Sequence, residues 1–153
     1  LIEEFIDGKQ ISSESIIYKN KAYNIGYSDR NYELIRPDRS TVIENGGDLP
    51  TSISSTVKNR IGINISQIAK ALNITNGVIK GDIIVKDSKV YILEIALRLS
   101  GGYFSSHKIP YSTGVDFLRI VMKILTNQKV KEKDFKVKYN RLGNWEYKLK
   151  NYE

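Results

Sequence analysis

The chain has 153 residues, 41% hydrophobic and 27% charged, which suits one soluble globular domain with a real core. It has no cysteine and a single histidine, His107, so disulfides, thiolate nucleophiles and zinc sites built from cysteines or several histidines are excluded. Any metal is therefore expected to be a hard cation held by oxygen, as Mg²⁺ is. The formal net charge of +7 suits a nucleic acid, an anionic membrane surface or a nucleotide, and does not choose among them.

Apolar runs are short throughout the sequence. The longest, VYIL and FLRIVMKIL, fall far short of the roughly 20 residues that span a bilayer, and no signal peptide is visible. We therefore predict a cytoplasmic protein that does not enter a membrane. The only methionine is Met122, so a sequence that opens on LIEEF is expected to be a piece of a longer chain.

The first half of the chain predicts a β-hairpin, a loop and a helix. Residues 11–27, ISSESIIYKNKAYNIGY, contain two β-rich runs around a Lys-Asn-Lys turn. Residues 28–50 mix charged residues with glycines and prolines, which is typical of a loop. In residues 51–73 apolar side chains recur at helical spacing, with Gly62 and Asn64 as candidate points for a bend or break. The apolar positions are Val57, Ile61, Ile65, Ile68 and Leu72.

The second half predicts another hairpin, another helix and a basic tail. The runs VIKGDIIV and VYILEIAL are joined by the connection KDSK. In residues 113–127 a helix is predicted, with Thr113 and Asp116 as start signals. Its expected apolar face is Val115, Leu118, Val121, Met122 and Leu125. We treat residues 1–127 as one unit and residues 128–153 as a basic tail, in which FKVKY and WEYKL are predicted to form a closing β-hairpin.

The order of strand pairs and helices predicts the fold class. Strand pair, helix, strand pair, helix and strand pair indicate an α+β fold, an antiparallel sheet with helices packed on one face. The sequence has no Gly-x-Gly-x-x-Gly or Walker loop, so the usual phosphate-binding loops do not apply.

The strand VYILEIALR contains the first candidate functional residues. Its side chains alternate between two faces, and Glu94, Ala96 and Arg98 share one of them. The other face, expected to point into the core, consists of Tyr91, Leu93, Ile95 and Leu97. If the hairpin loop has three or five residues, the numbers of two residues that face each other sum to an even total. In that register Asp82 lies opposite Glu94. Two carboxylates that close repel each other unless a cation such as Mg²⁺ lies between them.

The loop after this strand suits an anion. Arg98 can present its planar guanidinium to a phosphate or a carboxylate. The stretch LSGGYFSSHK adds flexible backbone and the polar residues Ser100, Ser105, Ser106, His107 and Lys108. On these residues alone the alternative is an acidic solvent face followed by an ordinary turn.

These segments resemble a known family. LEIALRLSGG, followed by SSHKIPYSTGVD, is similar to the closing signature of the ATP-grasp enzymes, which include biotin carboxylase, carbamoyl phosphate synthetase, D-alanine ligase and the glycinamide ligases. The resemblance covers residues 1 to about 127 and implies the C-terminal part of the grasp domain. It implies that Asp82 and Glu94 hold Mg²⁺ (or Mn²⁺) against the phosphates of ATP. It also implies that Arg98 is the catalytic residue, in contact with phosphate or an acyl phosphate.

The front of the chain agrees with this resemblance. LIEEFIDGKQISSE is similar to the hinge strand of the family, where an acidic pair and the hydrophobic residues after it clamp adenine. This implies nucleotide contacts for Glu3, Glu4 and Ile6. Glu14 matches, more weakly, an acidic residue that binds ribose or orients a lysine. His107 is added as a further candidate for nucleotide binding.

The sequence departs from the family at two points. Ala96 stands where many members have an asparagine that is a further magnesium ligand, so water is expected to take that place. The N-terminal substrate domain and the first half of the grasp, with its glycine-rich loop and lysine, are not in this sequence. The implied function is therefore that of a fragment of an ATP-dependent carboxylate–amine ligase, inactive by itself. Its implied partners are ATP, a small carboxylate and the missing N-terminal part, and a homodimer is left open.

Two other functions remain as alternatives. A basic nucleic-acid-binding module is suggested by the tail, where Phe135 and Tyr139 could stack on bases. The basic residues there are Lys129, Lys131, Lys133, Lys136, Lys138 and Arg141. A solvated lysine-rich surface is the preferred interpretation, because no recognised nucleic-acid motif accompanies these residues. The other alternative is a degenerate grasp domain kept for interactions, for which Ala96 is the hint.

Overall fold

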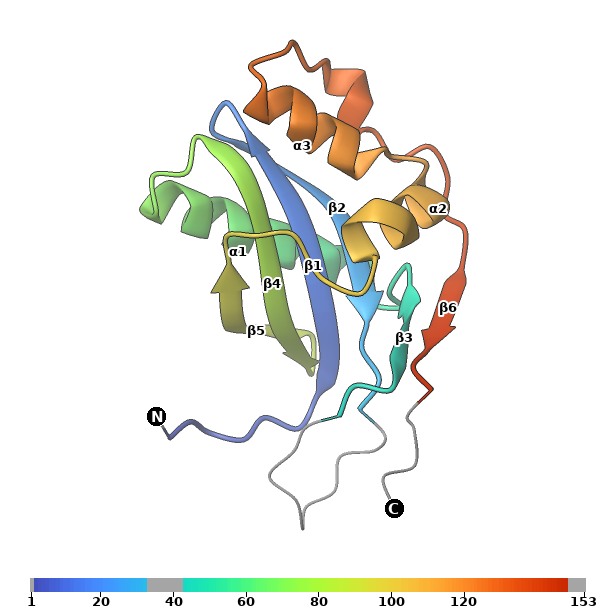
Figure 1. Cartoon of the computed structure of the whole chain (residues 1–153). Coiled ribbons are helices and arrows are strands. Elements are labelled where there is room, and N and C mark those ends of the chain that lie inside the picture. Colours follow the sequence, from blue (N-terminus) through green and yellow to red (C-terminus); the bar gives the residue numbers. More distant parts are fainter. Residues whose placement is uncertain (1, 33–42, 149–153) are drawn as a thin grey trace.

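The computed structural model describes residues 2–32 and 43–148 of the chain (Figure 1). The strands in these ranges are β1 (Lys9–Tyr18), β2 (Lys21–Asp29), β3 (Gly46–Leu49), β4 (Asn76–Lys86), β5 (Lys89–Ala96) and β6 (Gly143–Glu146). The helices are α1 (Ser55–Ala71), α2 (Ile109–Thr113) and α3 (Phe117–Leu125), with a π-helical turn η1 (Phe104–Lys108) and a 3₁₀ turn η2 (Glu132–Phe135). No helix in the described ranges has the length and apolar character needed to cross a bilayer.

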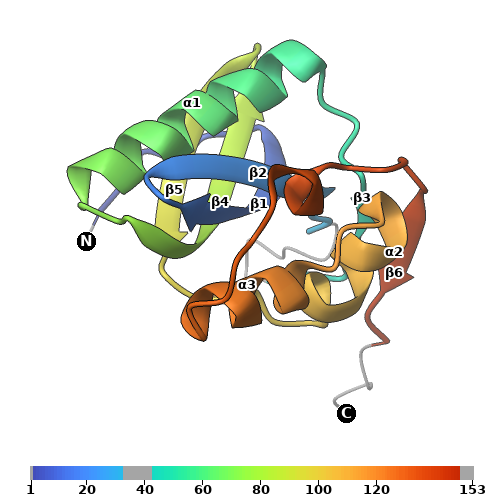
Figure 2. The same ribbon diagram turned by 90° about the horizontal axis from the view of Figure 1, so that it is seen from above.

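An antiparallel sheet in the order β2-β1-β4-β5 forms the centre of the molecule. Helix α1 covers one face of this sheet, and α2 and α3 cover the other (Figure 2). The α+β class and the antiparallel sheet are confirmed, but the expectation that the helices pack on one face is wrong. The reason lies in β1, where Ile11 and Ile17 join the core under α1 while Ile16 joins the core under α3. A strand with buried apolar side chains on both faces needs cover on both.

Both predicted hairpins are present, each with a two-residue turn. Lys19 and Asn20 connect β1 to β2, and Asp87 and Ser88 connect β4 to β5. All four residues have positive φ angles, between 49° and 63°, as the common two-residue hairpin turn requires. The expected loop of residues 28–50 contains β3, which the sequence reasoning missed, and residues 33–42 of it lie outside the described ranges.

Helix α1 runs without interruption through Gly62 and Asn64, so neither residue breaks it. It begins after Ser54, whose hydroxyl accepts a hydrogen bond from a backbone N–H of the first turn and so satisfies one of the free donors there. Its buried residues recur at every fourth position and are Val57, Ile61, Ile65 and Ala69. The predicted face was therefore right for three residues, whereas Leu72 is exposed beyond the last turn.

Helix α3 uses only part of the predicted face, since Val115, just before the helix, and Val121 are buried as predicted. Phe117, Ile120 and Val121 are buried against the sheet, whereas Met122 and Leu125 are 57% and 72% exposed. The sequence has apolar residues on both stripes of this helix, so periodicity alone could not choose between them. Burial of the large Phe117 ring decides which stripe faces the sheet.

Asp116 caps α3, because its side chain accepts a hydrogen bond of 3.1 Å from the backbone N–H of Arg119. Asp116→Ala is expected to lower the free energy of unfolding by about 1 kcal/mol, because that N–H loses its acceptor. Urea denaturation of the variant checks this, with Asp7→Ala as the control because Asp7 is an exposed acid in a segment without a helix. A change below about 0.5 kcal/mol, typical of neutral surface substitutions, would contradict a capping role.

The pairing of β4 with β5 aligns Asp82 with Glu94, as predicted. The predicted loop length was wrong, because the turn between the two strands has two residues rather than three or five. A β-bulge beyond Ile83, with Leu93 as the extra residue on β5, shifts the register by one instead. The bulge also changes which side chains face the core.

Two leucines of β5 consequently leave the predicted core. Leu93 is 49% exposed and Leu97 is 60% exposed. Ile92 packs against the core under α1 instead, and Ile95 packs there as predicted. The alternation fails between Ile92 and Glu94 because an extra residue in one strand reverses the faces beyond it.

The tail does not form the predicted closing hairpin in the described ranges. Strand β6 pairs with β3, which places Trp145 opposite Gly47. Phe135 is buried and stacks on Tyr23 with 3.7 Å between ring centroids. The segment after Phe135 donates backbone hydrogen bonds to the end of α2, the Lys138 N–H to Thr113 and the Arg141 N–H to Ser112. The tail therefore packs across the core under α3 instead of folding on itself.

Candidate functional site

Two neighbouring rows of side chains cross the sheet on the face under α2 and α3. The first row consists of Ser28, Ser12, Asp82 and Glu94, one residue from each strand. The second row consists of Gly26, Glu14, Lys80 and Ala96. Paired residues of neighbouring strands point to the same side of a sheet, so the two rows make one polar strip.

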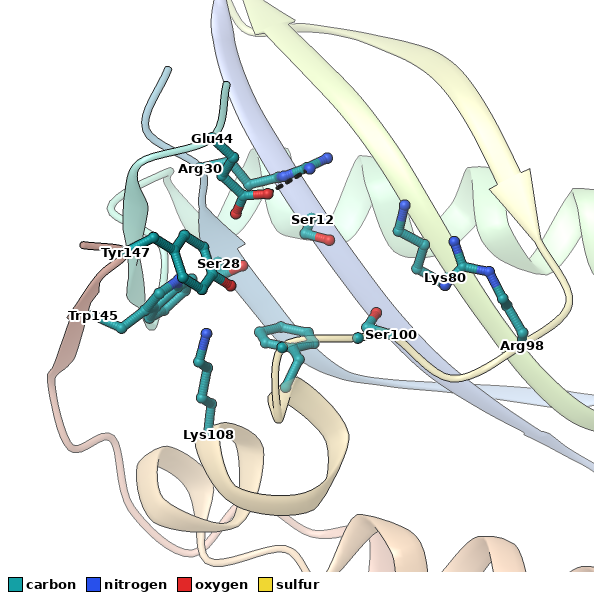
Figure 3. Close-up of a pocket in the computed structure, with 13 residues that line it drawn as sticks. Ser12, Ser28, Arg30, Glu44, Lys80, Arg98, Ser100, Lys108, Trp145 and Tyr147 are labelled. Carbon is teal, nitrogen blue, oxygen red and sulfur yellow. Dashed lines mark hydrogen bonds and ion pairs between the residues drawn. The ribbon is translucent and has the colours of Figure 1, made fainter. Parts of the chain in front are cut away.

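A cavity of about 320 Å³ lies where this polar strip meets the loop after β5 (Figure 3). We call it the cationic pocket. The charged residues that line it are Arg30, Glu44, Lys80, Arg98 and Lys108. The Ser28 hydroxyl also borders it, is buried, and has no hydrogen-bond partner among the described residues. Four cations against one carboxylate, with an unpaired hydroxyl beside them, suit an anionic ligand.

Asp82 holds two of these cations in place. Arg30 donates from Nη1 to Asp82 Oδ1 over 2.7 Å and from Nη2 to Glu44 Oε2 over 2.7 Å. Lys80 forms an ion pair with the other oxygen of Asp82. Burial by itself lowers the pKa of Arg30, but the hydrogen bond to Glu44 and the neighbouring charges outweigh it and raise that pKa. Arg30 therefore stays charged at the wall of the pocket.

The other predicted metal ligand, Glu94, is exposed on the edge strand β5 and pairs in register with Asp82. No group of three or more His, Asp or Glu side chains suited to a metal occurs in the described part of the chain. In phosphate sites, however, Mg²⁺ is held by one or two carboxylates together with phosphate oxygens. A cross-strand pair of carboxylates fits that set of ligands. Ala96, in the next row, has no side-chain oxygen to add.

Arg98 lies at the start of the loop and lines the cationic pocket. Its side chain is exposed, and it donates one hydrogen bond of 3.1 Å to the neighbouring carbonyl of Leu99. The loop then passes under the aromatic side chain of Tyr147. Gly102 has φ +61°, and a Cβ atom there would lie 2.6 Å from the Tyr147 hydroxyl oxygen. A residue without a side chain suits both that backbone conformation and that close approach.

Glu14 lies under the loop and is fully buried. Its Oε1 accepts hydrogen bonds from the backbone N–H of Ser100, over 3.0 Å, and from the Ser105 hydroxyl, over 2.6 Å. Burial raises the pKa of Glu14, although these hydrogen bonds and the charge of Lys80 oppose the shift. A carboxylate enclosed in this way is not accessible to a ribose. Glu14 instead joins the loop to the sheet, directly opposite Lys80.

The remaining predicted residues do not reach the cationic pocket. Glu3 and Glu4 are exposed and Ile6 is half-buried, all in the extended segment before β1. His107 lies on η1, where its Nδ1 is 2.7 Å from the Ser106 hydroxyl, and it borders a different cavity. The structure thus brings Arg98 together with the cations around Asp82, and leaves the hinge residues and His107 apart.

Several residues that line the pocket were not predicted from the sequence, among them Arg30, Glu44, Trp145 and Tyr147. Arg30 and Glu44 fall in the segment taken as a loop, and Trp145 and Tyr147 fall in the tail. A signal existed for Arg30, because continuing the alternation of β2 puts it on the same face as Ser28. Trp145 is the only tryptophan of the chain, but nothing local indicated that it pairs with β3.

Comparisons with known proteins identify the family and the fold of the chain. The family model described as "ATP-grasp domain" matches residues 1–102. No curated protein sequence matches the chain. Among solved structures the chain is similar to a phosphoribosylglycinamide synthetase from Anaerococcus prevotii, with a TM-score of 0.77 and 20% identity over 92% of this chain and 35% of that one.

Two further structures extend this similarity. An L-amino acid ligase from Bacillus licheniformis matches with a TM-score of 0.76 and 17% identity, over 92% of this chain and 35% of that one. A biotin carboxylase–β,γ-ATP complex from Campylobacter jejuni matches with a TM-score of 0.67 and 17% identity, over 88% and 29%. The chain thus spans about a third of the length of these proteins. The TM-scores show a shared fold. The family model matches more than half of the chain, and the chain therefore belongs to the ATP-grasp family.

Proposed function

We propose that the chain is the C-terminal part of the grasp domain of an ATP-dependent ligase that activates a carboxylate as an acyl phosphate. The observation that supports this most is the cationic pocket, which Arg98 lines and in which Arg30 and Lys80 pair with Asp82, the cross-strand partner of Glu94. ATP-grasp proteins generally bind MgATP, which matches the polyanion that four cations suit. Because the chain spans about a third of the matched structures, the reaction is proposed for this chain together with the rest of the domain.

The proposed roles follow from the positions of the side chains. Asp82 and Glu94 would hold Mg²⁺, which when bound neutralises charge on the phosphate oxygens. Arg98, whose side chain is exposed, binds the transferring phosphoryl group with its planar guanidinium and offsets the charge that develops there. Arg30 and Lys80 exchange Asp82 for phosphate oxygens when nucleotide enters, which leaves Asp82 free for the metal.

The proposed reaction has two transfers. In the first, an oxygen of the substrate carboxylate bonds to the γ-phosphorus of ATP while the bond to the bridging oxygen breaks, so that ADP leaves. In the second, an amine nitrogen bonds to the acyl carbon, the bond from that carbon to the phosphate oxygen breaks, and inorganic phosphate leaves while the amine nitrogen gives up a proton to the phosphate or to water. The chain contributes positioning and charge, and none of its residues is assigned as a general base. By itself it is expected to bind nucleotide weakly and to catalyse neither step.

The proposal predicts Mg²⁺-dependent binding of ATP in the cationic pocket. Titration of the 153-residue chain with ATP, with and without Mg²⁺, should shift the amide NMR signals of Ser12, Gly101 and Gly102, which line the pocket. Asp82→Asn and Glu94→Gln should each weaken the Mg²⁺-dependent affinity by about tenfold or more, because each removes a charged ligand.

The control for these variants is Asp87→Asn, which removes a carboxylate from the turn of the same hairpin at a position with φ 49° that asparagine tolerates. It should bind MgATP as the wild type does. If both Asp82→Asn and Glu94→Gln shift the same signals with unchanged affinity, the metal site is not there. A further variant, Arg98→Ala, should weaken ATP binding both with and without Mg²⁺.

The structure weakens the nucleic-acid alternative. Phe135, one of two aromatic residues suggested for base stacking, is buried against Tyr23 and not available to a base. Binding of an oligonucleotide that depends on salt and is unchanged in Asp82→Asn would favour that alternative. A chain that binds neither ATP nor an oligonucleotide would instead favour the degenerate domain for which Ala96 is the hint.

A further inference from the structure

A second cavity, of about 610 Å³, meets the cationic pocket at Lys108 and Trp145. Both side chains border both cavities. We call the second one the apolar cavity, because apolar and aromatic side chains form much of its lining, among them Leu49, Pro110, Tyr111, Leu142 and Trp145. Its volume is that of sites which bind small organic molecules. The junction is therefore a place where one ligand can reach both cavities.

Within residues 2–32 and 43–148, Lys108 is a cation without a carboxylate partner at this junction. Its Nζ lies 3.7 Å from the centroid of the Trp145 ring and 5.4 Å from that of Tyr147, and the side chain points toward them in Figure 3. None of the ion pairs among the described residues includes it, in contrast to Arg30 and Lys80, which both pair with Asp82. Burial lowers the pKa of Lys108 to about 8, against the opposing charge of Glu44. A half-buried ammonium of this kind is stabilised by a bound anion.

The apolar cavity has features of a site that a ligand completes. Leu142 is 69% exposed and Tyr111 is exposed, so both present apolar surface that a ligand would cover. Ser112 also borders the cavity, is fully buried, and its hydroxyl has no hydrogen-bond partner among the described residues. Unpaired buried hydroxyls are uncommon in proteins and call for a partner.

We propose that Lys108 binds the carboxylate of the acyl substrate and that the apolar cavity receives its organic side chain, so that the substrate is a carboxylic acid with an apolar body of ring size or larger. This rests on the proposed function, which requires a carboxylate next to the phosphoryl group. Lys108 and Arg98 line the same pocket, so a carboxylate held by Lys108 lies in the pocket proposed for that group. Trp145 borders both cavities and contacts the ligand where its charged and apolar parts join.

The test uses Trp145, the single tryptophan of the chain, as its reporter. Phenylpropionate, added to the 153-residue chain without nucleotide, should change the indole fluorescence and the Nε1–H NMR signal in a saturable way. Lys108→Gln should weaken this binding by about tenfold or more, because a charge-assisted contact is lost. The control Lys129→Gln, which changes an exposed lysine that borders neither cavity, should leave the affinity unchanged.

Two further probes separate the two parts of the site. Phenylpropanol, which has the ring but no charge, should bind more weakly than phenylpropionate and equally well to the wild type and to Lys108→Gln. Acetate, which has the charge but no ring, should bind about tenfold more weakly than phenylpropionate. Leu142→Ala, at a side chain exposed enough to leave folding intact, should weaken phenylpropionate binding without changing that of acetate.

Each part of the inference can be overturned separately from the proposed function. Unchanged phenylpropionate affinity in Lys108→Gln would remove the carboxylate contact, and acetate binding as tight as phenylpropionate binding would remove the apolar subsite. If MgATP binds as proposed but phenylpropionate does not bind, this inference fails and the proposed function stands. If phenylpropionate binds with the expected dependence on Lys108 but MgATP does not bind, the carboxylate site stands and the ATP-dependent function fails.

Discussion

Replacing Phe117 by alanine is expected to lower the free energy of unfolding by about 3–5 kcal/mol, the range for removing a buried aromatic side chain. Phe117 is fully buried at the start of α3, in the core between the sheet and the helices α2 and α3. Its neighbours in this core include Ile16 on β1 and Ile109 on α2, on elements that only partly relax to fill a cavity. Urea denaturation followed by circular dichroism measures the loss.

The matched control lies on the same helix. Met122 is an apolar residue of α3 that periodicity placed in the core and that the structure leaves 57% exposed. Met122→Ala should change the unfolding free energy by no more than about 0.5 kcal/mol. Equal losses in the two variants would mean that α3 packs on the stripe that periodicity had favoured, and the core under α3 would have to be redrawn.

Replacing Glu14 by alanine is expected to lower the free energy of unfolding by about 2–4 kcal/mol. The change leaves the Ser100 N–H and the Ser105 hydroxyl without their common acceptor and opens a cavity under the loop. Glu14→Gln should cost less, because a glutamine oxygen can accept both hydrogen bonds, although its NH₂ group then needs an acceptor of its own. Urea denaturation at neutral pH gives the order of the variants.

The free energy of unfolding of Glu14→Gln is also expected to depend on pH differently from that of the wild type. Burial raises the pKa of Glu14 above its ordinary value of 4.5, so the folded state holds the proton more tightly than the unfolded state. The contribution of this group to stability is therefore greatest below pH 4.5 and decreases as pH rises through the folded-state pKa. Glu14→Gln lacks this decrease, so its stability relative to the wild type should rise with pH across that window and then level off.

This prediction is checked by urea denaturation of both proteins at intervals from pH 4 upward. The quantity to compare is the difference between the two free energies of unfolding, because all other titrating groups are shared and cancel. A difference that stays constant with pH would show that Glu14 titrates alike in the folded and unfolded states. The buried, proton-favouring environment described for it would then be wrong.

Much of the site could be predicted from short segments. The two turns joining the hairpins are local. Asp82 was expected opposite Glu94, although the bulge at Leu93 rather than the loop length sets that register. Arg98 and the glycine loop follow directly after the same strand, so their place beside the pair follows from chain connectivity. Resemblance to the ATP-grasp signature added the expected chemistry, and the family match confirmed the membership.

Other features could not be predicted because local patterns left two solutions equally good. Helix α3 has apolar residues on two stripes, and only contact with the sheet selects Phe117 over Met122. The bulge at Leu93 is one extra residue within an otherwise regular alternation, yet it exchanges the faces of Leu93 and Ile92. The sequence alternation is satisfied with or without such a bulge.

The sequence by itself therefore determined the two hairpins and the two longer helices, because these depend on interactions between residues close along the chain. The alignment of Asp82 with Glu94 also needed the bulge at Leu93. Only the tertiary structure decided that helices cover both faces of the sheet and that β6 pairs with β3. It also decided that Arg30, Lys108 and Trp145 meet Arg98 at one pocket. The physical reason is that contacts between distant residues form where they bury the most apolar surface, including that of Phe117, Phe135 and the β1 isoleucines. The total apolar surface buried is a property of the whole packed chain rather than of any one segment.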